Sequence, residues 1–322
     1  MSNNWQPSAS INTLQTRAKL IANIRAFFAE RDVLEVDTPL MCHTSVTDPF
    51  IESIPTLFKS HVNCEENYYY LQTSPEYAMK RLLAAGSGSI YQICKAFRQS
   101  EVGRIHNPEF TMLEWYRIGF DHHQLMDEMD ELLQFILKTP PALRETYARI
   151  FKSYLQIDAH HANIAELAAC AKKHNVQVEA NIHDRDTWLM LLFTHCIEPK
   201  LGQTRPCFIY DFPASQAALA RIQASNPPIA SRFEVYFYGT ELANGFHELQ
   251  NAAEQRQRFE NNLAERKKLG LSLLPIDENF LAALQAGLPN CAGVALGIDR
   301  LLMLANKADQ LADILSFDIN CV

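Results

Sequence analysis

The chain has 322 residues, of which 48% are hydrophobic, and a formal net charge of −8 at pH 7. This length and composition are sufficient to bury a large core in one globular domain. The negative charge excludes broad electrostatic capture of nucleic acid but is compatible with a local basic patch. The apolar runs are shorter than the roughly 18 residues of a membrane helix, and the first ten residues show no signal pattern, so neither a membrane partner nor export is expected.

The eight cysteines stand singly in the sequence. None forms a C-x-x-C pair or has a histidine at zinc-ligand spacing. They are predicted to be reduced and mostly buried thiols, which is typical of a cytoplasmic protein. They are Cys42, Cys64, Cys94, Cys170, Cys196, Cys207, Cys291 and Cys321.

A helix followed by a strand is predicted near the start of the chain. Residues 12–30 carry apolar side chains at near-helical spacing, after a possible cap at Asn12 or Thr13. The next segment, VLEVDTPLM, is predicted to form a strand that ends at Pro39. The helical spacing rests on Leu14, Ile21, Ile24 and Phe28.

The segment LQTSPEYAMKRLLAAG predicts a second helix with both ends marked. Ser74 is a good N-cap, Pro75 stands where a first-turn proline is tolerated, and Gly86 can end the helix. Glu76 lies in the first turn, where the helix dipole favours an anion. On these grounds alone, helix capping explains Glu76 better than a substrate does.

Two segments rich in β-branched and aromatic residues, 90–98 and 110–118, predict an antiparallel hairpin. Alternate side chains of a strand share a face, so Glu114 stands in one row with Phe110 and Tyr116. A carboxylate in an apolar row needs a cationic partner or a wet pocket that receives one. The connecting loop carries anion donors, namely Arg98, Arg104 and His106, with Asn107 beside them. The hairpin therefore predicts a site for a polyphosphate at one end and an amine at the other.

Residues 119–230 are the least informative part of the chain. The run HHQLMDEMDELLQFILK predicts an amphipathic helix, and the remainder is mainly a helical pattern broken by proline and asparagine. The paired histidines fit surface or helix-end positions better than ligand positions, and no chemistry is assigned to them. They are His122, His123, His160 and His161.

Glutamates recur at intervals of seven in the segment from Phe233 to Gly270. A strand is predicted over residues 233–242, leading through the turn-prone pair Asn244–Gly245 into a long helix that ends at Gly270. Strict alternation would put the first two glutamates on opposite faces, so a shared site requires an irregularity, for which Gly239 is suited. Carboxylates that share a site with a triphosphate imply Mg²⁺. The three glutamates are Glu234, Glu241 and Glu248.

The segment CAGVALGIDRLLMLANKA predicts a strand of small residues that runs into a helix capped by Asp299. Arg300 would then stand in the first helical turn, where a cation opposes the helix dipole by about 0.3–1 kcal/mol. Arg300 therefore predicts a bound anion or an aromatic ring on which it stacks.

These segments together resemble the three motifs of class II aminoacyl-tRNA synthetases, in the form found in lysyl-tRNA synthetases. FRQSEVGRIHNPEFTMLEWY resembles motif 2, which is placed at about residues 90–118. Motif 1 is placed at about 12–40, and motif 3 at about 291–306. The resemblance implies an α+β fold, with an antiparallel sheet flanked by helices in a single catalytic domain over 1–322. It also implies a helical insertion at about 120–230, and a homodimer formed through motif 1.

The resemblance implies roles for individual residues. Arg98 and Arg300 would be catalytic, and Mg²⁺ would bind Glu234 and Glu241. The residues implied to bind ATP are Arg98, Ser100, Arg104, His106, Asn107, Phe110, Glu241, Leu242, Gly297 and Arg300. The residues implied to bind the amino-acid substrate are Ser74, Pro75, Glu76, Glu114, Tyr116, Asn244, Phe246, Glu248 and Ala295.

The sequence departs from this family at two positions. Ala295 replaces the glycine typical of lysyl-tRNA synthetases, and one added methyl in a closed pocket changes substrate choice by roughly 1–3 kcal/mol. A lysine variant with a displaced amino group could then be preferred. Ser100 stands where motif 2 usually has glutamate. Whether the adjacent Glu101 takes over the contact of that glutamate with ATP or the amino group is left open.

The sequence has neither a P-loop nor a Rossmann phosphate-binding motif. Motif 1 begins about a dozen residues from Met1, which leaves no room for the N-terminal anticodon-binding OB barrel of lysyl-tRNA synthetases. A core of this kind resembles the elongation factor P lysine ligases, which attach (R)-β-lysine to a lysine of that factor. The resemblance implies ATP-dependent formation of an aminoacyl-adenylate from lysine or (R)-β-lysine, with elongation factor P and not tRNA as acceptor.

Three other functions are compatible with the same motifs. A lysyl-tRNA synthetase core would charge tRNA, although the missing barrel disfavours it. An amino-acid ligase of the asparagine synthetase A type would share the core but would not explain Glu248 and Tyr116. An inactive paralogue would have lost ATP-binding residues, whereas only Ser100 is unusual here.

Overall fold

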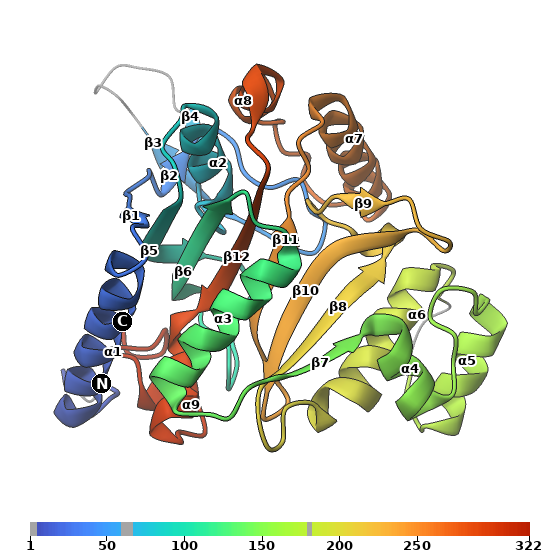
Figure 1. Cartoon of the computed structure of the whole chain (residues 1–322), viewed down its shortest axis with the longest axis horizontal. Helices are drawn as coiled ribbons and strands as arrows, with labels where there is room; N and C mark the ends of the chain where they lie inside the picture. The colour runs from blue at the N-terminus through green and yellow to red at the C-terminus, as the bar shows by residue number, and fades with distance from the viewer. Residues whose placement is uncertain (1–4, 59–66, 179–181) are drawn as a thin grey trace. The chain divides into compact units, whose positions relative to one another are not determined.

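The structure is a computed structural model that describes residues 5–58, 67–178 and 182–322 (Figure 1). It contains a large, mostly antiparallel sheet flanked by helices, which confirms the predicted α+β class. The chain divides into two compact units. Unit 1 comprises Met1–Ile118, Gln250–Asn290 and Ala295–Val322, and unit 2 comprises Gly119–Leu249 and Cys291–Val294. The single catalytic domain predicted over the whole chain stays a prediction.

Unit 1 contains the segments predicted as motifs 1 and 2 and most of motif 3. Its helices are α1 (Ile11–Ala29), α2 (Glu76–Ala84), α7 (Ala252–Lys268), α8 (Glu278–Gly287), α9 (Ile298–Asn306) and the short η4 (Leu311–Asp313). Its strands are β1 (Leu34–Glu35), β2 (Met41–Cys42), β3 (Ile54–Phe58), β4 (Asn67–Leu71), β5 (Ile90–Phe97) and β6 (Glu109–Ile118). Strand β12 (Cys291–Gly297) contributes its last three residues to this unit.

The strands of unit 1 form one part of the large sheet and a separate small sheet. The order in the large sheet is β1-β5-β6-β12, and the small sheet has the order β2-β4-β3. The strand predicted to end at Pro39 is much shorter than expected, because only Leu34 and Glu35 pair with β5. The Thr38 hydroxyl instead donates a hydrogen bond to Oε1 of the buried Gln92 at 2.9 Å, and the chain leaves the sheet at Pro39.

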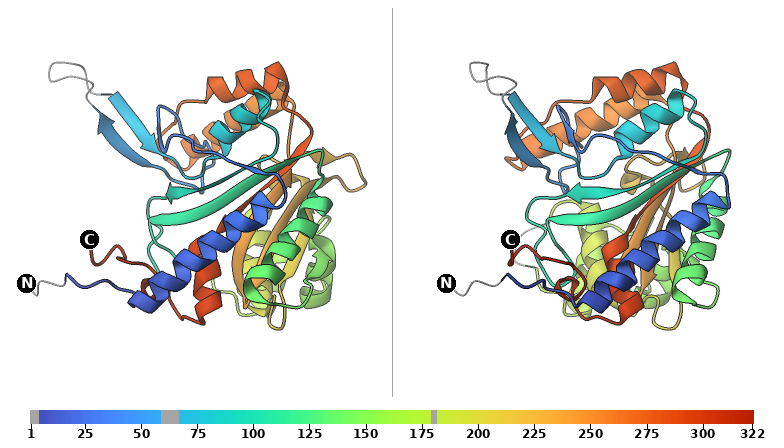
Figure 2. Two further views of the ribbon diagram at one scale, coloured as in Figure 1. Left: turned by 60° about the vertical axis from the view of Figure 1, so that its left-hand side comes forward. Right: turned by 90° about the vertical axis from the view of Figure 1, so that its left-hand side faces the viewer.

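Helix α1 is capped one turn earlier than predicted. Ser10, and not Asn12 or Thr13, is the N-cap, and its hydroxyl accepts a hydrogen bond from the backbone N–H of Thr13. Just before the cap, Ser8 and Ala9 donate backbone hydrogen bonds to the C-terminal segment at Ser316 and Leu315. Figure 2 shows the C-terminal segment beside the start of α1.

Helix α2 begins as predicted within one residue. Pro75 is the N-cap and makes no side-chain capping bond, while the Ser74 hydroxyl accepts a long hydrogen bond from the Glu76 N–H at 3.5 Å. Gly86 follows the C-cap with a φ of +89°, which confirms its role in ending the helix. The Tyr77 ring stacks on Phe280 of α8 at 4.6 Å, and this contact fixes α2 against its neighbour.

Unit 2 contains more sheet than the predicted helical insertion allowed. Its helices are α3 (His122–Leu137), α4 (Tyr147–Leu155), α5 (Ile164–Lys173), α6 (Arg185–Leu192) and the short η1 (Phe193–Ile197), η2 (Glu198–Lys200) and η3 (Ala214–Gln216). Its strands are β7 (Leu143–Thr146), β8 (Cys207–Pro213), β9 (Ile222–Gln223), β10 (Ile229–Phe237) and β11 (Thr240–His247), together with the start of β12.

The strands of unit 2 follow the order β12-β11-β10-β8-β7, and β9 also pairs with β10. Three of them lie within the range predicted to be helical. The run CFIYDFP of β8 is short, apolar and aromatic, a pattern that periodicity alone cannot separate from a buried helix segment. Helices α4 to α6 close the core of this unit, in which Tyr147 stacks on Phe151 at 4.6 Å and on Phe193 at 5.7 Å.

The single strand predicted over residues 233–242 is in fact a two-stranded hairpin. Strands β10 and β11 are joined at Tyr238 and Gly239, which have φ values of +49° and +65°. Positive φ at both central residues is the geometry of a type I′ hairpin turn. The predicted turn at Asn244–Gly245 was wrong, because Gly245 lies inside β11 directly opposite Phe233.

We expect Gly245→Ala to destabilise the protein by about 1–3 kcal/mol, the usual effect of overpacking a core. An added Cβ would lie 2.4 Å from the Phe233 ring, which is fully buried. Equilibrium denaturation in urea measures the change. Gly103→Ala is the matched control, because its Cβ would meet nothing nearer than 4.0 Å. Equal stability of the two variants would contradict this account of Gly245.

Among the described residues, no helix combines the length and the apolar character that crossing a membrane requires. The seven described cysteines are all free thiols, and four of them are buried, as predicted. Cys64 lies outside the described residues.

Candidate functional site

The predicted motif 2 hairpin is present with the predicted boundaries. Strands β5 and β6 pair antiparallel from Ile90↔Tyr116 to Phe97↔Glu109, so the loop spans residues 98–108. Glu114 and Tyr116 are both buried and lie on one face, where the Tyr116 hydroxyl donates to the Glu114 carboxylate at 2.6 Å. The alternation of the sequence predicted this shared face correctly.

A buried lysine, Lys80 of α2, lies beside Glu76 and the Tyr116 ring. The Lys80 ammonium lies 2.5 Å from the Glu76 carboxylate, and its side chain is 1% exposed. It lies 6.0 Å from the centre of the Tyr116 ring and 5.8 Å from that of Phe280. A buried ammonium held this closely fixes the rotamer of Glu76. Glu76 is therefore more than a helix-end residue.

We expect Lys80→Met to raise the KM for the amino-acid substrate about tenfold or more and to leave the KM for ATP nearly unchanged. The reason is that a hydrogen bond between charged groups contributes about 1.5–3 kcal/mol, and its loss lets Glu76 move. Methionine fills the space between Tyr116 and Phe280. Lys95→Met is the control, because Lys95 also pairs with a glutamate, Glu109, but both of these side chains are exposed. An unchanged amino-acid KM in a folded Lys80 variant would refute the role.

Arg98 begins the motif 2 loop next to an aromatic ring. Its guanidinium lies 5.1 Å from the centre of the Phe110 ring and 3.5 Å from the Glu101 carboxylate. Ser100 adopts a φ of +64°, a left-handed conformation that few non-glycine residues take. Glu101, and not Ser100, is thus the loop residue whose side chain meets Arg98. Whether Glu101 serves ATP in the way of the family glutamate stays a prediction.

Arg300 and His106 form the second cationic group of the loop. Helix α9 begins at Ile298 with Gly297 as N-cap, so Arg300 stands in its first turn, as predicted. The Arg300 guanidinium donates to His106 Nε2 at 2.8 Å and to the Ile105 carbonyl at 3.4 Å. Burial and the Arg300 charge lower the pKa of His106 below its ordinary value, so the ring is neutral at pH 7 and accepts this bond.

Asp299 does not cap α9 as predicted but joins all three motif segments. It is 2% exposed, and its carboxylate accepts hydrogen bonds from the Arg17 guanidinium of α1 at 2.6 Å and from the Thr111 N–H of β6 at 2.7 Å. Arg17 also donates to the Thr111 hydroxyl at 2.5 Å. This buried junction sets the position of α9, and therefore of Arg300, relative to the hairpin.

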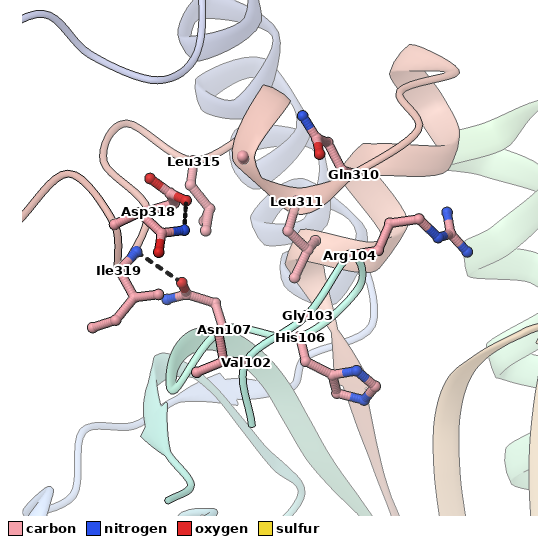
Figure 3. A pocket seen from close by; sticks show the side chains of 12 residues that line it. Val102, Gly103, Arg104, His106, Asn107, Gln310, Leu311, Leu315, Asp318 and Ile319 are labelled. Atoms are coloured by element: carbon pink, nitrogen blue, oxygen red, sulfur yellow. Dashed lines mark hydrogen bonds between the residues drawn. The ribbon is translucent and has the colours of Figure 1, made fainter. Parts of the chain in front are cut away.

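Arg104 and Asn107 are fastened to the C-terminal segment. Arg104 donates to the Asp309 carbonyl at 2.6 Å, and the Asn107 amide bonds the backbone of Glu109 at 2.6 Å and of Ile319 at 3.1 Å. These contacts border a polar cavity of about 190 Å³ (Figure 3), in which Arg104 and His106 point away from the Asn107 side. The carboxamide of Asn107 therefore holds the loop in place here, and its contact with ATP stays a prediction.

In unit 2, the hairpin of β10 and β11 brings Glu234 and Glu241 onto one face. Residues opposite each other in an antiparallel pair point the same way, and the pairs are Glu234↔Asn244 and Tyr236↔Glu241. The register shifts between Val235 and Tyr236, which makes Leu242 the extra residue of β11. The predicted irregularity is therefore at Gly239, but it is a hairpin turn and not a bulge within one strand. The bulge at Leu242 in turn places Asn244 on the same face. Phe246, opposite Arg232, shares this face.

Glu234, one member of the predicted metal pair, also accepts hydrogen bonds from neighbouring side chains, and the Mg²⁺ pair itself stays a prediction. One oxygen of Glu234 accepts a hydrogen bond from Arg232 and the other from the Tyr236 hydroxyl. Burial and the Glu234 charge raise the pKa of Tyr236 well above its ordinary value, so this hydroxyl keeps its proton. Each carboxylate oxygen has a second lone pair, so these hydrogen bonds are compatible with a bound cation. Glu241 is half-buried on the same face.

The remaining predicted residues lie at the ends of their elements. Glu248 is 1% exposed and follows β11, and its N–H donates to the Cys291 carbonyl at 3.0 Å. Ala295 is half-buried in β12, two residues before the α9 cap at Gly297. Unit 1 thus carries the cationic loop, Glu76, Glu114 and Tyr116. Unit 2 carries Glu234, Glu241, Leu242, Asn244, Phe246 and Glu248.

Three residues of these groups were missed by sequence reasoning. Lys80 could have been found, because it follows Glu76 by four residues on a helix, the spacing of an ion pair. Arg232 precedes Glu234 by two residues on a strand and so shares its face, which is a weaker signal. Arg17 gave no signal, since it lies 282 residues from Asp299 in the sequence.

Comparison with known proteins agrees with this geometry. The family described as "tRNA synthetases class II (D, K and N)" matches residues 5–320. The chain belongs to this class II synthetase family. Three relatives that match nearly the whole chain are each named "Elongation factor P--(R)-beta-lysine ligase".

These relatives cover almost all of the class II chain described here. The protein of that name from Vibrio parahaemolyticus is 55% identical over 98% of both chains. That from Vibrio cholerae is 55% identical over 97% of both chains. The relative from Haemophilus influenzae is 51% identical over 99% of this chain and 98% of its own.

Proposed function

We propose that this protein is an ATP-dependent ligase that activates (R)-β-lysine, or lysine, and transfers it to a lysine side chain of elongation factor P. The observation that carries the proposal is the identity of 55% over 98% of both chains with a relative named for this reaction. The cationic loop of unit 1 supports the nucleotide part, because its guanidinium groups suit phosphate. The acidic residues support the amine part.

The first step forms an aminoacyl-adenylate. A carboxylate oxygen of the amino acid attacks the α-phosphorus of ATP, and the bond to the β-phosphate oxygen breaks to release pyrophosphate. Arg98 stabilises charge at the α-phosphate, and Arg104, His106 and Arg300 hold the outer phosphates. Phe110 and Arg300 hold the adenine between them. Catalysis in this step is positioning and preorganised charge.

The second step transfers the aminoacyl group to the acceptor. The neutral ε-amine of the acceptor lysine attacks the acyl carbonyl, AMP leaves and the amine loses a proton, so that an amide bond forms. No enzyme nucleophile is needed. Cys94 of β5 is not suited to act as one. Burial and the nearby Glu114 carboxylate raise the pKa of its thiol to about 12, and a protonated thiol is a poor nucleophile.

The amino groups of the substrate are proposed to bind to buried acidic residues of the chain. Glu76, held by Lys80, and Glu114 with its Tyr116 bond supply two carboxylates. Glu248, buried after β11, supplies the third. Carboxylates bind ammonium groups strongly where water is excluded. The resemblance implies that Ser74, Pro75, Asn244, Phe246 and Ala295 also bind this substrate, and that the Ala295 methyl sets the preferred isomer.

Mg²⁺ is proposed to enter with the phosphates of ATP. The residues proposed to hold it are Glu234 and Glu241, which lie on one face of the β10–β11 hairpin. A bound Mg²⁺ would neutralise phosphate charge. In this arrangement Glu234 fixes the Arg232 side chain, Leu242 sets the bulge, and Gly297 leaves room beside Arg300.

A homodimer through motif 1 is also proposed. Large apolar side chains are exposed on this segment, with Ile11 63%, Leu34 55% and Met41 39% exposed. Such residues are typical of a surface that a second subunit covers. The proposed compartment is the cytoplasm, because free thiols persist in a reducing environment.

The proposal is tested by weighing elongation factor P. The pure protein is incubated with ATP, Mg²⁺, the factor and either (R)-β-lysine or lysine, and the factor is then analysed by mass spectrometry. The expected result is one added lysyl residue that requires ATP, with no charging of lysine tRNA in a parallel reaction. Omission of ATP is the control. An unchanged factor with both isomers would refute the acceptor, and charged tRNA would favour the synthetase alternative.

A further inference from the structure

We propose that His122, His123 and Asp211 form a binding site for one borderline divalent transition-metal ion such as Zn²⁺. One ligand atom from each of these residues lies within 4.8 Å of the other two. Among the described residues, this is the single group of three such side chains that meets this distance. All three belong to unit 2, so the inference is independent of the proposed reaction.

The sequence could not bring these residues together, because Asp211 is 89 residues from His122. The two histidines are the first residues of α3, and Asp121 caps the helix through a capping box with Gln124. Asp211 lies in β8, where the register to β10 shifts between Ala230 and Phe233. This irregularity gives Asp211 a φ of +58°, which interrupts the regular strand at this residue.

The spacing of two ligand atoms suits a tetrahedral ion. His122 Nε2 and Asp211 Oδ1 are 3.3 Å apart, which is long for a charge-assisted hydrogen bond. Two atoms that each lie about 2.0–2.1 Å from a tetrahedral Zn²⁺ are separated by roughly this distance. The His123 ring lies beside that of His122, with 4.1 Å between the ring centres. A small closure of the three side chains would complete the coordination.

The other ring nitrogen of His122 does not compete for this position. The His122 side chain is 3% exposed, and its Nδ1 atom has no hydrogen-bond partner among the described residues. Nδ1 points away from Asp211, so it can carry the ring proton while Nε2 remains the ligand atom that faces Asp211. Two imidazoles and one carboxylate with an open fourth position are a donor set that Zn²⁺ takes. Hard Mg²⁺ prefers oxygen ligands and is not expected.

The site would tie the start of α3 to β8. The cation would lie at a helix N-terminus, which is unfavourable, but the carboxylates of Asp121 and Asp211 offset this. Arg144 of β7, the strand next to β8, also carries a positive charge. Asp127 pairs with it at 2.7 Å and so offsets that charge. Metal binding is therefore expected to stabilise unit 2 rather than to take part in the ligase reaction.

The test is titration of the metal-free full chain with Co²⁺ in the absence of ATP. The expected result is the visible absorption of one tetrahedral Co²⁺ per chain, without a thiolate charge-transfer band, and its loss when Zn²⁺ is added. His123→Ala and Asp211→Asn should each weaken Zn²⁺ binding by about 100-fold. Loss of a residue that only supports a ligand already costs about 10–100-fold, and each of these variants removes a ligand itself. His123 is exposed, so its variant is expected to fold.

His161→Ala is the matched control. His161 also pairs with an aspartate, Asp158 at 3.1 Å, but no third ligand completes that pair among the described residues. This variant should bind Co²⁺ as the unchanged chain does. Zn²⁺ should raise the thermal midpoint of the unchanged chain and of His161→Ala but not of His123→Ala. Absence of binding, or binding that survives both site variants, would overturn the inference.

Discussion

Arg300→Ala is expected to reduce ATP–pyrophosphate exchange by about 10²–10³-fold. This is the loss observed when one donor is removed from a preorganised charge-stabilising site. The Arg300 side chain is held by His106 Nε2 at 2.8 Å and by the Ile105 carbonyl at 3.4 Å, so it is positioned before any nucleotide binds. Exchange is measured with ATP, labelled pyrophosphate and the amino acid at saturating concentrations.

Arg256→Ala serves as the control for Arg300. Arg256 is paired with Glu278 in unit 1, and both side chains are largely exposed. An exposed pair of this kind contributes about 0–1 kcal/mol, so exchange by this variant should be unchanged. Thermal unfolding of both variants separates a catalytic effect from loss of fold. Exchange by a folded Arg300 variant within threefold of the unchanged protein would remove Arg300 from the chemistry.

Asp299→Ala is expected to destabilise the protein by about 3–5 kcal/mol. The substitution leaves the Arg17 guanidinium, whose side chain is 17% exposed, without its carboxylate. Removing one partner of a buried ion pair has this cost because the remaining charge stays away from water. The Thr111 N–H loses its acceptor as well. Equilibrium denaturation in urea, followed by circular dichroism, measures the change.

Glu278→Ala is the control for Asp299. It also removes the carboxylate partner of an arginine in unit 1, but Glu278 is 65% exposed, and the expected loss is below about 1 kcal/mol. The double variant Arg17→Met with Asp299→Ala should recover part of the stability, because no buried charge then remains. Equal stability of the two single variants would show that the junction of the three motifs is not held by Asp299.

The parts of the site that depend on local pattern could be predicted from the sequence. The hairpin of β5 and β6 has the predicted boundaries because its strands are β-branched and aromatic and its loop is polar. The contact between Tyr116 and Glu114 follows from the period of two along a strand. The first-turn position of Arg300 follows from the small-residue strand that precedes α9.

The second acidic segment shows where local pattern misleads. Asn244–Gly245 is the stronger hairpin signal, yet the chain turns at Tyr238–Gly239, where an aromatic residue takes a positive φ. Tertiary packing decides this, since a side chain at position 245 would collide with the Phe233 ring. The bulge at Leu242 is likewise set by pairing across strands and not by the residue itself.

Long-range pairs account for the remaining differences. Asp299 looks like a helix cap in the sequence, but its carboxylate bonds Arg17 and Thr111 instead. Glu234 stands out in the sequence by its charge, and its oxygens accept hydrogen bonds from Arg232 and Tyr236. In both cases the sequence identifies a residue with a charge to satisfy. Only the fold identifies the partner that satisfies it.

The central claim is that one reaction uses both the cationic loop and the acidic residues, and ATP–pyrophosphate exchange tests it most directly. The pure protein is assayed with ATP, Mg²⁺ and labelled pyrophosphate, with and without (R)-β-lysine or lysine. The account predicts exchange that depends on one of these amino acids and that is lost in both Arg300→Ala and Glu114→Gln. Exchange that proceeds equally well without any amino acid would contradict it.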